Sequence, residues 1–93
     1  MNLNDIDMKI LTENFNEELI RKMDADNISK IFNYLKKNDI YYAKDLLLTS
    51  LDLFLLDSNV FIDKFEKLKS KLGKDYVDKL GEDSSLIELM YQN

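Results

Sequence analysis

Residues 28–37 read ISKIFNYLKK, and this stretch decides the fold that we expect for the whole chain. Its apolar side chains recur at the spacing i, i+3, i+4, i+7, which places them on one face of an α-helix. They are Ile28, Ile31, Phe32 and Leu35. The pattern predicts that Asp26 or Asn27 caps the start of this helix, and that Asn38 ends it as a left-handed cap.

Helical spacing of apolar residues continues through most of the chain, and the composition agrees with it. Apolar residues make up 45% of the 93 residues and charged residues 33%, which is the balance of a globular domain. The chain holds two glycines and no proline, whereas all-β folds need both at their many turns. We therefore expect an all-α fold, a compact array of six or seven short helices in one domain.

Polar residues at fixed offsets predict where other helices begin and end. Asn14 with Glu17, and Ser85 with Glu88, have the spacing of a capping box. Gly73 follows the last apolar residue of a long amphipathic stretch, where a glycine commonly terminates a helix.

Two segments of the chain align with each other. FNYLK at 32–36 matches FEKLK at 65–69, and further apolar positions match at an offset of 33–34 residues. Such a period is typical of stacked helical repeats, although two amphipathic helix pairs also align through periodicity alone. We predict a single domain, 1–93, with N-terminal capping helices at 1–24, a first helical unit at 28–57 and a second at 58–91.

Three stretches carry a family resemblance. They are LKKNDIYYAKDLL at 35–47, LFLL at 53–56 and FEKLKSKLG at 65–73. Over residues 28–91 the chain resembles the mitochondrial transcription termination factor repeat, a family that stacks units of two helices and a 3₁₀ turn into a superhelix. The resemblance implies stacked helical units and a nucleic-acid partner, and it assigns no functional residue.

The composition removes most catalytic and metal-binding chemistry. The chain has no cysteine and no histidine, so it lacks a thiolate, the commonest general base and the usual nitrogen ligand of zinc. It also contains no glycine-rich phosphate loop and no motif that activates a serine. We therefore expect no enzymatic activity, no cofactor, no metal and no small-molecule site.

One short run begins like a calcium loop. It is DADN at 24–27, but Ile28, Ser29 and Leu35 stand where the loop requires a ligand, a glycine and a glutamate. We therefore interpret the run as the cap of the following helix.

Because catalytic and metal-binding motifs are missing, we expect a non-enzymatic interaction module that binds another protein or itself. Tyr34, Tyr41 and Tyr91 fall outside the main apolar stripes, and tyrosine provides contact area at low entropic cost. We take these three as candidate protein-binding residues, although singly exposed tyrosines are also ordinary. The leucine-rich run 46–56 is interpreted as the centre of the core, with an association surface as the alternative.

A row of lysines supports the alternative function, nucleic-acid binding. The row consists of Lys64, Lys67, Lys71 and Lys74. The spacing i, i+3, i+7, i+10 would form one stripe on a helix, as a row of phosphates requires. Acidic residues adjoin the row and the net charge of −5 disfavours a nucleic-acid partner, so we favour a solvated helix face.

The sequence also bears on location. The N-terminal residues carry acid where a signal peptide needs base. No stretch reaches the roughly 20 apolar residues of a membrane span. We therefore expect a cytoplasmic protein with no membrane partner.

Overall fold

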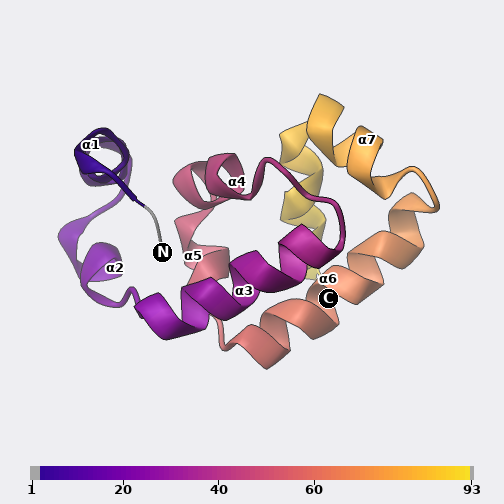
Figure 1. Cartoon of the computed structure of the whole chain (residues 1–93), viewed down its shortest axis with the longest axis horizontal. Coiled ribbons are helices and arrows are strands. Elements are labelled where there is room, and N and C mark those ends of the chain that lie inside the picture. Colours follow the sequence, from indigo (N-terminus) through magenta and orange to yellow (C-terminus); the bar gives the residue numbers. More distant parts are fainter. Residues whose placement is uncertain (1–2, 93) are drawn as a thin grey trace.

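Two long helices, α3 (Ala25–Lys37) and α6 (Ser58–Leu72), lie side by side in the middle of the structure (Figure 1). In this computed structural model, which describes residues 3–92, the two helices run in the same direction. A parallel pair requires the chain to return from the end of α3 to the start of α6, and the intervening short helices make that return.

Polar contacts fix the register of α3 against α6 at both ends. Where the helices begin, the Asn27 amide nitrogen donates to the carbonyl of Leu56 at 2.7 Å, and its Oδ1 accepts the N–H of Ser58 at 2.8 Å. Where they end, Lys69 Nζ donates to Asn38 Oδ1 at 2.7 Å. A half-buried amide with both partners satisfied resists sliding, because a shifted register would leave its polar atoms unpaired.

Shorter helical elements precede and follow the long helices. They are α1 (Asp5–Asn14) and α2 (Glu17–Arg21) before α3, α4 (Ala43–Thr49) and α5 (Leu51–Phe54) after it, and α7 (Tyr76–Glu82) and the 3₁₀ helix η1 (Ser84–Gln92) after α6. No strand occurs within residues 3–92, so the prediction of an all-α fold is confirmed. The order of one long and two short elements occurs twice; that the two units are copies of one repeat stays a prediction.

The first two helices begin at asparagine caps. Asn4 Oδ1 accepts the N–H of Asp7 at 2.8 Å, and Asp7 Oδ2 accepts the N–H of Asn4 at 3.2 Å, which is a reciprocal capping box. The side chain of Asn16 caps α2. The predicted box of Asn14 with Glu17 is therefore wrong, because Asn14 is the last residue of α1.

Asp24 caps α3. Its Oδ1 accepts the N–H groups of Asp26 and Asn27 at 3.0 and 3.2 Å. The prediction that Asp26 or Asn27 is the cap is therefore wrong by two or three residues, since both are donors in the first turn. The interpretation of the run 24–27 as a helix cap is confirmed.

The remaining helix ends give one confirmed prediction and one wrong one. Gly73 ends α6 with φ 83, in the left-handed region that favours glycine, as predicted. Ser85 lies inside η1, and its N–H donates to Asp83 Oδ1 at 3.2 Å. The predicted capping box of Ser85 with Glu88 is therefore wrong.

The core lies between α3, α6 and the shorter helices. Three phenylalanine rings meet there: the ring centroids of Phe54 and Phe61 are 5.3 Å apart, and those of Phe61 and Phe65 are 5.9 Å apart. The leucine-rich run 46–56 supplies buried residues that the core cluster contains. They are Leu46, Leu47, Leu51, Leu53 and Phe54. The interpretation of this run as core is confirmed.

We expect Phe65→Ala to lower the free energy of unfolding by about 3–5 kcal/mol, because the ring is fully buried and its loss leaves a cavity. Val60→Ala on the same helix is the control, since Val60 is 44% exposed, and its effect should stay within about 0.5 kcal/mol. Urea titration followed by far-UV circular dichroism measures both. Similar small effects of the two changes would contradict the assignment of Phe65 to the core.

Candidate functional site

The C-terminus of α3 turns the chain sharply and prepares the candidate site. The N–H of Asp39 donates to the carbonyl of Lys36 at 3.1 Å, and the N–H of Ile40 donates to that of Leu35 at 3.0 Å. These two bonds form a Schellman motif, in which the left-handed residue is Asp39 with φ 65. The predicted left-handed cap at Asn38 is wrong by one residue, because Asn38 has φ −98.

The turn sends two neighbouring side chains in opposite directions. Ile40 is 2% exposed and packs in the core, whereas Tyr41 is 88% exposed. Tyr42 holds the far side of the turn, because its hydroxyl donates to the carbonyl of Val77 at 2.6 Å. Burial raises the pKa of Tyr42 to about 12, so this hydroxyl keeps its proton near neutral pH. The Tyr41 ring stands edge-on to that of Tyr42, with centroids 5.0 Å apart.

We expect Asp39→Gly to raise the free energy of unfolding by roughly 0.5 kcal/mol, since glycine adopts a positive φ without steric cost. Gly73→Ala should lower the free energy of unfolding by about 1 kcal/mol, because alanine adopts the positive φ of Gly73 only with strain, although open space surrounds the position of the added Cβ. Urea titration of both variants checks the pair. Destabilisation by Asp39→Gly would contradict the left-handed turn.

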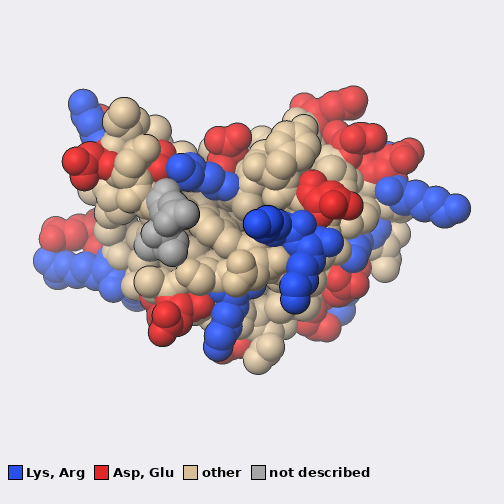
Figure 2. All heavy atoms as spheres, in the orientation of Figure 1, with Lys and Arg blue, Asp and Glu red and all other residues tan. Residues whose placement is uncertain are grey.

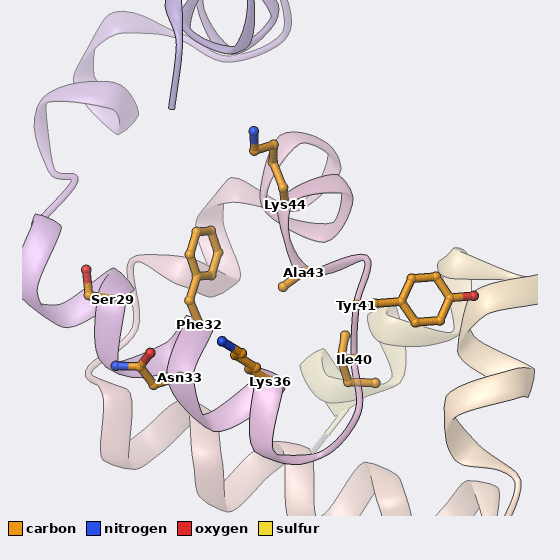
Figure 3. Close-up of a pocket in the computed structure, with 8 residues that line it drawn as sticks. All are labelled: Ser29, Phe32, Asn33, Lys36, Ile40, Tyr41, Ala43 and Lys44. Atoms are coloured by element: carbon orange, nitrogen blue, oxygen red, sulfur yellow. The ribbon is translucent and has the colours of Figure 1, made fainter. Parts of the chain in front are cut away.

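The turn closes one end of an open groove of about 500 Å³ between α3 and α4 (Figure 3). Its lining residues are Ser29, Phe32, Asn33 and Lys36 from α3, Ile40 and Tyr41 from the turn, and Ala43 and Lys44 from α4. The four α3 residues follow the spacing i, i+3, i+4, i+7, so they share one face of that helix. Figure 2 shows both basic and acidic side chains around an uncharged area in the middle of this side of the molecule.

The floor of the groove is apolar. Phe32 is half-buried, and its ring meets the edge of the Phe54 ring with centroids 5.8 Å apart. Figure 3 shows the Phe32 ring standing between α3 and α4, while the Tyr41 ring points away from the groove at its end. The sequence pattern places Phe32 on one face with Leu35, but Leu35 is fully buried and Phe32 lies at the edge of that face. A bulky side chain from outside could therefore cover Phe32.

The two lysines of the groove differ in whether their ammonium groups form an ion pair. Lys44 Nζ forms an ion pair of 3.0 Å with Asp7 Oδ2, and in Figure 3 its ammonium points toward α1. The hydrogen bond from Lys44, assisted by the N–H of Asn4, holds the pKa of the buried Asp7 carboxyl below its ordinary value. The ammonium of Lys36, by contrast, forms no ion pair with any residue that the structure describes.

We expect Asp7→Asn to lower the free energy of unfolding at neutral pH, because it removes the carboxylate that bonds Lys44 and Asn4. The pKa of Asp7 is lower in the folded protein than in the unfolded chain. The wild type is therefore more stable than the variant at pH values well above 3.8, and this difference in the free energy of unfolding is lost as the pH falls below 3.8. Urea titrations of both chains at neutral and acidic pH measure this difference. A difference that stays constant down to strongly acidic pH would contradict the paired carboxylate.

The three predicted tyrosines lie at three separate places. Tyr34 donates its hydroxyl to the Glu66 carboxylate and packs edge-on to Phe65, so it joins α3 to α6. Tyr91 on η1 donates to Asp52 Oδ2 at 2.6 Å beside a cavity of about 250 Å³. Burial raises the pKa of both tyrosines. Of the three, only Tyr41 lines the groove between α3 and α4.

The predicted lysine row is shorter than expected. Lys64, Lys67 and Lys71 lie on α6, but α6 ends at Leu72 and Gly73 turns the chain away. The prediction that Lys74 continues the same helical stripe is therefore wrong. Lys67 forms an exposed i,i+4 ion pair of 3.6 Å with Asp63, and Lys64 lines the cavity beside Tyr91.

The sequence pattern did not single out most of the groove residues. The predicted binding residues are tyrosines and a row of lysines, whereas the groove combines Phe32, Lys36 and Ile40 with the start of α4. The sequence feature that connects four of them is the spacing of Ser29, Phe32, Asn33 and Lys36 along one helix face. This face becomes a wall of the groove only because α4 lies opposite it in the folded chain.

The part of the chain that the structure describes forms neither a metal-binding cluster nor a membrane span. There, no three side chains of the types His, Cys, Asp or Glu are placed to hold a metal ion. No helix within residues 3–92 is long and apolar enough to cross a membrane. No family model, no curated protein and no solved structure matches the chain. The resemblance to the mitochondrial transcription termination factor repeat therefore stays a prediction.

Proposed function

We propose that this chain is a non-enzymatic helical module that binds another protein, or a second copy of itself, through the groove between α3 and α4. The observation that carries the proposal is the half-buried Phe32 on the floor of an open groove that ends at the 88% exposed Tyr41. Bulky aromatic side chains in partly enclosed sites contribute most of the binding energy in protein interfaces.

The surroundings of the groove favour binding because they are already ordered. The register of α3 is held by the contacts of Asn27 and Asn38 with the α6 unit. The turn that carries Tyr41 is held by the Schellman bonds and by the hydroxyl of Tyr42. A site that needs little ordering loses less entropy when a partner binds.

The absence of cysteine and histidine from the sequence supports a non-catalytic role. Nucleic-acid binding stays the alternative, and no geometric observation favours it, since Lys74 leaves the lysine row and Lys67 pairs with Asp63.

A photo-reactive benzoylphenylalanine at position 41 of the full chain tests the proposal in the cells that produce it. We expect irradiation to cross-link position 41 to a discrete protein, and position 60 on α6 to give no such product. Unlabelled wild-type chain should compete for the cross-link. A Phe32→Ala, Tyr41→Ala chain should compete at least about tenfold more weakly, as two truncated aromatic contacts predict.

Lys67→Glu with Lys71→Glu is the matched surface control, and this chain should compete as well as the wild type. Fluorescence anisotropy with a DNA duplex and an RNA at about 50 and 200 mM salt tests the alternative. Steeply salt-dependent binding that disappears in the double lysine variant, together with no protein cross-link at position 41, would replace the proposal. A cross-link to the chain itself would identify the second copy as the partner.

A further inference from the structure

We infer that the groove between α3 and α4 receives an acidic protein segment, in which one bulky apolar side chain covers Phe32 and a nearby carboxylate pairs with Lys36. The inference rests on the proposed function and adds the chemistry of the partner. It follows from the charge of α3, from the arrangement of Phe32 and Lys36, and from the state of Lys44.

The charge of α3 is opposite to that of the whole chain. Residues 25–37 contain three lysines and one aspartate, whereas the chain has a net charge of −5. Lys30, Lys36 and Lys37 are all exposed. Of the three, only Lys36 lines the groove, and Lys30 and Lys37 lie elsewhere on the same helix. A basic helix on an acidic protein attracts an acidic partner, and the remaining acidic surface repels that partner from other docking sites.

Phe32 and Lys36 give the partner its spacing. They lie at i and i+4 on the same face of α3, a spacing that places their Cβ atoms about 5–6 Å apart. The Lys36 ammonium forms no ion pair with the described residues, so a carboxylate that reaches it displaces no existing partner. The partner therefore needs an apolar side chain and an Asp or Glu at matching separation.

Lys44 has a different part in this site. Its ammonium is held by Asp7, so it supplies its aliphatic stem to the groove wall. The same ion pair compensates the Asp7 carboxylate, which would otherwise repel an acidic segment that crosses toward α1. Asp39 is an acid near Lys36, and it lines a smaller hollow with Lys36, Ile40 and Tyr41. Asp39 therefore weakens the attraction of Lys36 for a carboxylate.

The charge of the chain favours a short protein segment over a nucleic acid. A base could stack on an aromatic ring and a phosphate could pair with Lys36, so the apolar floor alone does not separate the two partners. Each nucleotide, however, adds a further negative charge that a chain with net charge −5 repels, whereas a short segment needs only one or two carboxylates.

A random peptide display library selected on the intact chain provides the probe. We expect the enriched peptides to contain an aromatic residue or leucine with Asp or Glu within four residues of it. A fluorescein-labelled synthetic copy of the most enriched peptide is then titrated by anisotropy at about 50 and 200 mM salt, where weakening at higher salt reports the ion pair.

Three charge variants define the expected result. Lys36→Glu should lower the affinity for the peptide by at least about tenfold. Lys67→Glu makes the same charge change on α6 and should change that affinity less than about twofold. Asp39→Asn should strengthen binding by about two- to threefold, because it removes the repelling charge while asparagine tolerates the left-handed backbone. Circular dichroism confirms that the variants are folded.

Other outcomes overturn the inference. These outcomes are enrichment of neutral or basic peptides, failure of any peptide to bind, and indifference of an acidic peptide to Lys36→Glu. A duplex or RNA that displaces the peptide at equal concentration would make a phosphate the ligand instead. Sedimentation equilibrium that shows a dimer sensitive to Lys36→Glu would make a second copy the occupant. In each case a cross-link from benzoylphenylalanine at position 41 to another protein would leave the proposed function standing, so the two failures are distinguishable.

Discussion

The parallel packing of α3 against α6 is the interaction on which the other features depend. Asn27 fixes one end of the pair through the chain that enters α6, and Asn38 fixes the other end through Lys69. Between them, Phe65 is buried among the rings of Tyr34, Phe61 and Tyr76. Because parallel helices cannot be joined by a short loop, the chain must leave α3 sharply and return along α4 and α5.

The groove is a consequence of that geometry. α3 directs Ile28, Ile31 and Leu35 into the core. Phe32 follows Ile31 by a rotation of about 100°, so its ring emerges at the flank of the buried face. α4 returns across this flank and leaves the groove of about 500 Å³ between the two helices. The same turn that buries Ile40 exposes Tyr41, so one backbone motif shapes both the floor and the end of the site.

The charges around the groove also follow from helix structure. Asp7 completes the capping box of α1 and pairs with Lys44 of α4, so one carboxylate stabilises a helix start and attaches α1 to the rest of the fold. Lys36 lies in the last turn of α3, where the helix dipole favours a cation, and no described carboxylate neutralises it. The result is a partly apolar groove on an acidic protein, with one lysine, Lys36, that forms no ion pair with a described residue.

The sequence by itself determined the helical class, the buried leucine-rich run 46–56 and the end of α6 at Gly73, because periodicity and backbone conformation are local properties. It missed the caps at Asp24 and Asn16 by a few residues, since several polar residues in each cluster could accept the same N–H groups. Only the tertiary structure decided that Phe32 is half-buried, that Lys44 pairs with Asp7 and that Tyr34, Tyr41 and Tyr91 lie apart. Each of these depends on which helix lies opposite, and contacts between residues distant in the chain leave no periodic trace in the sequence.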